Sequence, residues 1–162
     1  MKRKRYYVLF VCSGNTCRSP LAEALMKSRI RKEGMRNISV SSAGVSAAPG
    51  LRASQNSITV ARELGASLGG FRSSPVTDRR LALADLVLTM EKKHRDIILE
   101  RWPAAAGKVH VMTEFSRSGR RGISDPVGGP LTAYRECGLA IQDEINKIVP
   151  GIKKLISTRG RK

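Results

Sequence analysis

The stretch VLFVCSGNTCRSP, residues 8–20, decides the fold that we expect for this chain. Its first part is an apolar run, which is typical of a strand buried on both faces of a parallel sheet. The chain then turns through Gly14 and Asn15 into a helix, for which Ser19 is a suitable N-cap and Pro20 a suitable first residue. The stretch therefore predicts a strand, a short loop and a helix in succession.

The rest of the chain continues this alternation of strands and helices. Strands are expected at residues 6–11, 38–42, 84–90 and 108–112. Helices are expected from Ser19 to Gly34 and over residues 52–68, 91–102 and 131–149. The inward positions of the second and last helices are expected to be Ile58, Ala61, Leu64, Leu139, Ile141, Ile145 and Ile148. Alternating strands and helices predict an α/β fold, a parallel sheet with helices on both faces.

Length and composition predict one domain over residues 1–162, because no repeat or linker divides the chain. The hydrophobic content of 41% suffices for one core, and no apolar run is long enough to cross a membrane. The formal net charge is +17, which favours phosphates or acidic partners. We interpret the basic tails, about 1–5 and 157–162, as solvated, and the segment SRSGRR at 116–121 as a loop that draws in acidic substrates. Aromatic residues make up only 4%, which disfavours nucleic acid as a partner.

The three cysteines cannot all pair with one another, and a domain of this size needs no disulfide to fold. We therefore expect a cytoplasmic location, where thiols stay reduced. The opening MKRKRYYVLFVC imitates a signal peptide, but the NTCRSP that follows is not a small-residue cleavage site. We expect no targeting segment there.

The loop that joins the first strand to the first helix has the residues of an anion site. Glycine and asparagine readily adopt left-handed backbone angles, so the loop can curl with its N–H groups inward. Arg18 can close such a ring on phosphate oxygens, and the positive end of the helix points at the same place. The same charges favour the thiolate of Cys12, which the Ser19 hydroxyl can stabilise. The spacing C-x5-R therefore predicts a nucleophile at the floor of an anion cradle.

Two other interpretations of the cysteines remain open. The first interpretation treats Cys12 and Cys17 as small buried hydrophobic residues, which is common but leaves the glycine, asparagine and arginine of the loop unexplained. They could also form half of a zinc site, but Cys137, His94 and His110 lack the paired spacing of further ligands. We expect no metal and no other cofactor, and we interpret both histidines as ordinary surface or strand residues.

These motifs resemble one family over almost the whole chain. VCSGNTCRSP, with SSAG at 41–44 and DPVGG at 125–129, is similar to the low-molecular-weight protein tyrosine phosphatases, and especially to their bacterial protein-arginine phosphatase branch. The resemblance implies a four-stranded parallel sheet, a cysteinyl-phosphate intermediate, phosphorylated protein substrates and no metal. It implies a phosphate-binding loop made of Ser13, Gly14, Asn15, Thr16, Cys17 and Ser19, with Cys12 as nucleophile and Arg18 as phosphate ligand.

The resemblance also gives Asp125 a role. An aspartate on a loop opposite the nucleophile can protonate the leaving group and then take a proton from the attacking water. Without the resemblance, Asp125-Pro126 reads as the start of a turn.

Some positions depart from the family pattern. Val127 stands where tyrosine-specific members usually have an aromatic residue, and Phe71 stands about where many have a histidine that supports the loop. The resemblance still provides Ser42 as a partner for Asn15. Thr16 matches the arginine phosphatases, whereas tyrosine-specific relatives typically have an aliphatic residue there, so Thr16 and Val127 are the expected specificity residues. Thr16 could also be a neutral loop residue that hydrogen-bonds local backbone.

Three further hypotheses follow from the same residues. Cys17 is expected to protect Cys12 from oxidation by forming a disulfide with it. An arsenate reductase of similar fold would need more cysteines to complete its disulfide cascade, and only Cys137 is left, which is expected to be buried in the last helix. A non-catalytic binder of phosphopeptides or nucleic acid is supported only by the charge.

Overall fold

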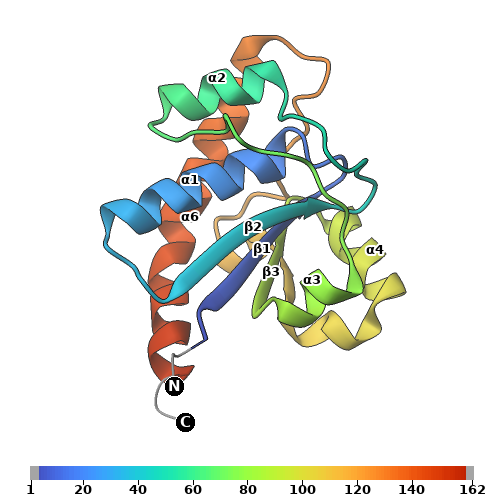
Figure 1. The fold of residues 1–162 in the computed structure, drawn as a ribbon, viewed down its shortest axis with the longest axis vertical. Helices are drawn as coiled ribbons and strands as arrows, with labels where there is room; N and C mark the ends of the chain where they lie inside the picture. The colour runs from blue at the N-terminus through green and yellow to red at the C-terminus, as the bar shows by residue number, and fades with distance from the viewer. Residues whose placement is uncertain (1–3, 160–162) are drawn as a thin grey trace.

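The structure is a computed structural model that describes residues 4–159. Its centre is a four-stranded sheet in the order β2-β1-β3-β4, with every neighbouring pair parallel (Figure 1). The strands are β1 (Tyr6–Cys12), β2 (Ile38–Gly44), β3 (Leu86–Thr89) and β4 (Val109–Val111). The predicted fold class and all four strands are confirmed.

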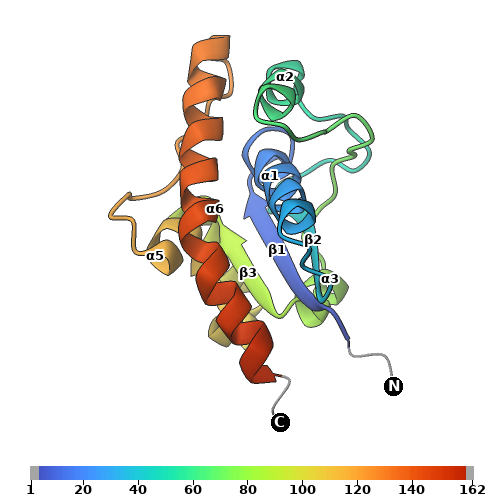
Figure 2. The same ribbon diagram turned by 90° about the vertical axis from the view of Figure 1, so that its left-hand side faces the viewer.

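Helices cover both faces of this sheet. One face carries α1 (Arg18–Lys32), α2 (Gln55–Glu63), α5 (Met112–Ser116) and α6 (Leu131–Arg159). The other carries α3 (Asp78–Leu83), α4 (Lys92–Arg101) and the short 3-10 helix η1 (Pro103–Lys108). Figure 1 shows α1 and α6 on one side of the strands and α3 and α4 on the other, and Figure 2 shows α6 running alongside α5.

Strand β1 explains why both faces must be covered. Val8 and Phe10 point into the core beneath α1 and α6, whereas Leu9 and Val11 point into the core beneath α3 and α4. All four side chains are fully buried, as the unbroken apolar run predicts. Because β1 is buried on both faces, the side chains along its length do not reach solvent. Cys12 and the following loop lie at its carboxyl end, which is where ligands bind in folds of this kind.

The start of α1 differs from the prediction. The helix begins at Arg18 with Cys17 as its N-cap, so Ser19 is a helical residue and not the cap. The reason is that the Ser19 hydroxyl is engaged with Cys12 and Asn15 on the loop side. The other end is as expected, because Gly34 takes the left-handed φ of 64° that terminates a helix just beyond Lys32.

The later helices differ mainly in length. The helix expected at 52–68 is shorter, because Ser54 caps it at the N-terminus and Gly65, with φ of 79°, follows its end. The last helix continues to Arg159 through an internal Pro150. Helices α3 and α5 were not predicted.

Two details of α6 correct the sequence analysis. Ile141, Ile145 and Ile148 are buried as predicted, but Leu139 is 56% exposed because it lies outside the stripe that they form. The segment expected as a basic tail from 157 is helical as far as Arg159, which forms an ion pair with Asp85 at 2.9 Å. The remainder of the two predicted tails, residues 1–3 and 160–162, lies outside the described residues.

No helix within residues 4–159 is both long enough and apolar enough to span a bilayer.

Candidate active site

The loop between β1 and α1 carries the site. Its carbonyl oxygens are bound from outside: Cys12 and Ser13 accept hydrogen bonds from residues 45 and 46, both at 3.0 Å, and Thr16 accepts one from Ser54 at 2.8 Å. By contrast, the backbone N–H groups of residues 13–17 have no acceptor anywhere in the described part of the chain. Backbone N–H groups left without partners at a helix N-terminus form a site for an anion.

Asn15 holds the loop in this shape. It takes the left-handed φ of 56° that the sequence suggested, and its side chain is fully buried. Its amide nitrogen donates to Ser19 Oγ at 2.8 Å and Ser42 Oγ at 3.0 Å, and its amide oxygen accepts from the Ser74 N–H at 2.9 Å. The implied contact with Ser42 is present, and the Ser74 N–H, three residues after Phe71, supplies a further contact to the Asn15 side chain.

Gly44 is a second structural requirement of the loop. A Cβ at Gly44 would lie 2.3 Å from the Ser13 carbonyl oxygen and 3.0 Å from the Asn15 nitrogen. The end of β2 therefore has to be glycine for the loop to pack this closely. The SSAG motif contains this glycine, but its sequence alone does not show which backbone it approaches.

Cys12 lies at the floor of the loop, 3% exposed. Its Sγ is 2.9 Å from Ser19 Oγ. Ser19 Oγ accepts a hydrogen bond from Asn15, and it can donate its one proton to the sulfur or to the more distant Ala43 carbonyl at 3.5 Å. The arrangement can thus stabilise negative charge on Sγ through a hydroxyl that is itself fixed in place.

The side chain of Arg18 connects the loop to three residues that are distant in the sequence. Its guanidinium is 1% exposed, forms an ion pair with Glu91, and donates to the Ile123 carbonyl at 2.9 Å. Its other terminal nitrogen lies 3.3 Å from Asp125 Oδ2. The structure therefore brings Asp125 to the same site as Cys12 and Arg18, and it adds Glu91, which the sequence analysis missed.

Asp125 lies on an exposed turn beside Arg18. Its second oxygen, Oδ1, accepts the Val127 N–H at 3.1 Å, so the Asp-Pro turn foreseen from sequence is also present. The carboxylate side chain is 41% exposed. Val127 itself is 63% exposed and contributes an open aliphatic surface at the rim.

His94 is the clearest error of the sequence analysis. It is not a surface or strand residue: it lies in the first turn of α4 and is fully buried. Its Nδ1 accepts the Glu91 N–H at 3.1 Å, so Nε2 carries the proton of the neutral ring and donates it to Ser13 Oγ at 2.9 Å. Burial, with the nearby Arg18 charge, lowers the pKa of His94 from 6.5 to about 4.

The capping pattern was the available signal for this histidine. Glu91 and His94 stand three residues apart at the predicted start of a helix, which is the spacing of a capping box. What the sequence could not show is that the free ring nitrogen reaches Ser13, which is distant in the chain. The other histidine, His110, lies on β4 and packs against Phe115, in agreement with its assignment as a strand residue.

Thr16 and Cys17 form the far side of the loop. Thr16 is partly exposed, and Cys17 is 5% exposed beneath it. The Cys17 sulfur lies 3.5 Å from Ser54 Oγ and 3.7 Å from the Tyr134 hydroxyl, and burial is the main cause of the raised pKa of Tyr134. All three cysteines are free thiols.

Cys137 is buried on α6, as the sequence predicted. Burial raises its pKa to about 12, so its thiol is protonated at neutral pH. A protonated, buried thiol is a poor partner for disulfide exchange. Within residues 4–159, moreover, no three histidine, cysteine or acidic side chains come together as ligands for a metal ion.

The basic segment 116–121 is only partly free. Arg120 binds Asp143 at 2.6 Å and the buried Glu144 at 2.8 Å, and these contacts raise its pKa and lower that of Asp143. Arg121 is exposed and lines a hollow of about 370 Å³ with Glu91 and Ser124, next to Asp125. The segment is therefore anchored to α6 through Arg120, and Arg121 remains available to a ligand.

A thiol at the floor of an open anion cradle, with an arginine and a carboxylate beside it on a parallel α/β fold, defines a cysteine-dependent phosphatase. Residues 7–158 match the family described as low molecular weight phosphotyrosine protein phosphatase. The chain belongs to this family, and it is a protein phosphatase.

Its relatives include both arginine and tyrosine phosphatases. The chain is 35% identical to a protein-arginine-phosphatase of Bacillus subtilis over 91% of its own length and 97% of the relative's. It is 33% identical to a probable low molecular weight protein-tyrosine-phosphatase, EpsP, of Ralstonia nicotianae, with the same shares covered.

Solved structures agree with this grouping. The YwlE arginine phosphatase of Geobacillus stearothermophilus superposes with a TM-score of 0.85 at 36% identity, covering 92% of this chain and 94% of that one. A cysteine-to-serine mutant of a YwlE arginine phosphatase, with its active site serine phosphorylated, superposes with a TM-score of 0.87 at 34% identity and covers 91% and 96% of the two chains.

Proposed function

We propose that this protein removes phosphate from phosphoarginine in proteins, with Cys12 as the nucleophile. The observation that carries the proposal is a buried Cys12 at the start of a loop whose backbone N–H groups have no acceptor within residues 4–159. Phosphate oxygens bound to those N–H groups and to Arg18 present the phosphorus atom to the sulfur. The mutant relative with a phosphorylated serine in its active site supports a phosphorylated enzyme intermediate.

The reaction has two steps. The Cys12 thiolate attacks phosphorus, the bond from phosphorus to the guanidine nitrogen breaks, and Asp125 gives that nitrogen a proton. A water molecule then attacks the cysteinyl phosphate, the Cys12 thiolate departs, and Asp125 takes the proton of the water. Ser19 stabilises the thiolate in both steps, as its 2.9 Å contact with the sulfur supports.

Arg18 has a further role before substrate arrives. Its ion pairs with Glu91 and Asp125 hold the guanidinium at the loop in the free enzyme. A bound phosphate competes with Asp125 for the same guanidinium. Binding of substrate thereby frees the Asp125 carboxylate from the guanidinium, and the carboxylate takes up a proton from solvent before it acts as acid.

Thr16 is the proposed specificity residue. Thr16 is partly exposed, and its hydroxyl lies 3.8 Å from the Cys17 sulfur; when substrate is bound, this hydroxyl hydrogen-bonds the guanidinium or orients the attacking water. An aliphatic side chain at the same place would favour the flat face of a phenol ring. The exposed Val127 offers no aromatic wall for that ring, and the similarity to the arginine phosphatase of Bacillus subtilis supports the same substrate class.

The test compares kcat/KM for a phosphoarginine protein and a phosphotyrosine peptide on the wild type, Thr16→Ile and Thr16→Ser. We expect the wild type to prefer phosphoarginine, the Ile variant to shift toward phosphotyrosine, and the Ser variant, which keeps the hydroxyl, to stay close to the wild type. A wild-type preference for phosphotyrosine that Thr16→Ile leaves unaltered would contradict the proposal. It would make the protein a phosphatase for phosphotyrosine.

We further propose that the protein works in the cytoplasm and binds acidic segments of its substrates. Free thiols at Cys12 and Cys17 need reducing surroundings, and the charge of +17 with an available Arg121 favours acidic sequences.

A further inference from the structure

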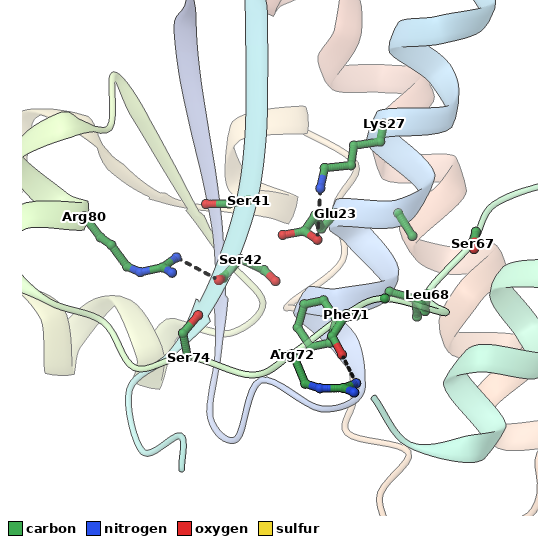
Figure 3. Close-up of a pocket in the computed structure, with 12 residues that line it drawn as sticks. Glu23, Lys27, Ser41, Ser42, Ser67, Leu68, Phe71, Arg72, Ser74 and Arg80 are labelled. Carbon is green, nitrogen blue, oxygen red and sulfur yellow. Dashed lines mark hydrogen bonds and ion pairs between the residues drawn. The ribbon is translucent and has the colours of Figure 1, made fainter. Parts of the chain in front are cut away.

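A second hollow adjoins the residues that bind the Asn15 side chain. It has a volume of about 360 Å³ and lies between α1, the end of β2 and the segment 67–74, with Arg80 of α3 at its edge. Figure 3 shows Ser42 between Arg80 on one side and Phe71 and Arg72 on the other. None of the residues that line it belongs to the 12–18 loop.

The charges of this hollow are largely uncompensated. Lys27 is paired with Glu23 at 3.3 Å, so these two cancel. Arg72 donates only to the neighbouring Phe71 carbonyl, and Arg80 only to the Ser42 carbonyl at 3.3 Å. Neither guanidinium has a carboxylate partner among residues 4–159, so two positive charges face the hollow unpaired.

The walls of the hollow are of two kinds. Phe71 and the buried Leu68 provide apolar surface, which Ala24 continues. Ser42, 2% exposed, accepts a hydrogen bond from Asn15, and its own hydroxyl proton has no acceptor in the described chain. A ligand that matches this lining has an anionic group for the arginines and Ser42, and a flat or apolar part for Phe71.

The hollow is hydrogen-bonded directly to the catalytic loop. Ser42 and Ser74 both line it, and both bind the side chain of Asn15, at 3.0 Å and 2.9 Å. Asn15 in turn fixes the left-handed turn of the loop and the position of Ser19. A ligand that moves either serine therefore acts on the residue that shapes the cradle.

We propose that this hollow binds a small organic phosphate as a second, non-catalytic site, and that occupation of the site alters the catalytic loop through Asn15. The charges of Arg72 and Arg80, which stand on either side of Ser42, attract the phosphate group, and the organic part lies against Phe71. The site is independent of which phosphorylated residue the enzyme hydrolyses.

The test is a titration followed by NMR of the backbone amides, with inorganic phosphate and with phenylphosphonate, a probe that is not hydrolysed. The Gly14 and Thr16 amides report the catalytic loop, and the Ser67 and Gly70 amides report the hollow. We expect two separate binding curves for both probes, with phenylphosphonate filling the hollow at lower concentration than phosphate. We also expect the Asn15 amide to follow both curves.

Variants assign the second curve. Arg72→Gln together with Arg80→Gln should abolish the response of Ser67 and Gly70 and the second component at Asn15, while the loop curve remains. Arg79→Gln, which removes an exposed charge outside the hollow, is the matched control and should behave as the wild type. Arg72→Gln alone should weaken the second curve, and the exposed Arg72 is not needed for folding.

Three results would overturn the proposal. The first is that the Ser67 and Gly70 amides do not respond to either probe, or that their response follows the loop curve and survives in the double variant. The second is that the hollow binds the two probes with equal affinity, which would mean that the organic part of the ligand contributes nothing to binding. The third is that the Asn15 amide follows the loop curve alone, which would mean that the hollow is not coupled to the catalytic loop. Because binding and not turnover is measured, each result leaves the proposed function intact.

Discussion

Replacement of His94 should change how stability depends on pH. In the folded protein its pKa is lowered from 6.5 to about 4, chiefly by burial. Between these values the unfolded chain binds a proton at this ring and the folded protein does not, so stability falls as pH falls. The pKa difference corresponds to at most about 3 kcal/mol, and we expect about 2 kcal/mol over the range of the assay, because that range stops short of the folded pKa.

The assay is urea unfolding of the wild type, His94→Gln and His94→Leu at a series of pH values from about 7.5 to about 4.5. Both variants lack the titrating ring, so both should lose about 2 kcal/mol less than the wild type over this range. They should differ in catalysis, since Gln can accept from the Glu91 N–H and donate to Ser13 as His94 does, whereas Leu cannot.

A further consequence concerns the loop itself. The hydrogen bond from His94 to Ser13 holds the loop residue that follows Cys12. We therefore expect kcat to fall in His94→Leu and to be largely restored in His94→Gln. If His94→Gln kept the full pH dependence of wild-type stability, the ring would not be the neutral, buried group that the structure places there, and this reasoning would be refuted.

The remaining predictions concern the catalytic residues and their surroundings. Asp125→Ala should slow phosphoarginine and alkyl phosphates far more than an activated aryl phosphate, measured as kcat; equal losses would remove Asp125 as the acid. Mild peroxide should inactivate the wild type reversibly and Cys17→Ser permanently, measured as activity regained with a thiol; identical recovery would make Cys17 a packing residue. Arg121→Gln should lower kcat/KM for acidic substrates and reduce its salt dependence. Arg120→Gln should mainly lower the free energy of unfolding, by about 1 kcal/mol, since the lost cation is partly exposed and the buried Glu144 keeps its hydrogen bond from Ser116. The reverse assignment of these two effects would contradict the anchoring of the segment through Arg120.

The fold was predictable because its signals are local. The apolar run of β1 and the Gly-Asn turn after it are read directly from neighbouring residues, and they place the first strand and the loop correctly. The error at Ser19 has a tertiary cause, since its hydroxyl serves Cys12 and Asn15 and not the helix end.

The site was predictable only where its residues are close in sequence. Cys12 and Arg18 stand on one loop, so spacing alone brings them together. The role of Asp125 was expected only from the family resemblance, because no local pattern places this residue beside Arg18. Glu91 and His94 were missed for the same reason: the capping pattern was visible, but its contacts with the loop join segments far apart in the chain.

The covalent intermediate on Cys12 is the central claim, and it can be observed directly. Asp125→Ala is mixed with an activated aryl phosphate, whose leaving group scarcely needs the proton, so the variant should form the cysteinyl phosphate but hydrolyse it slowly; the reaction is quenched within the first turnover, and the protein is digested and analysed by mass spectrometry. We predict one phosphoryl group on the peptide that contains Cys12, and none when Cys12→Ala is combined with the same change. Phosphoarginine hydrolysis that continues in the Cys12→Ala protein, with no phosphate on the loop peptide of either protein, would contradict the mechanism.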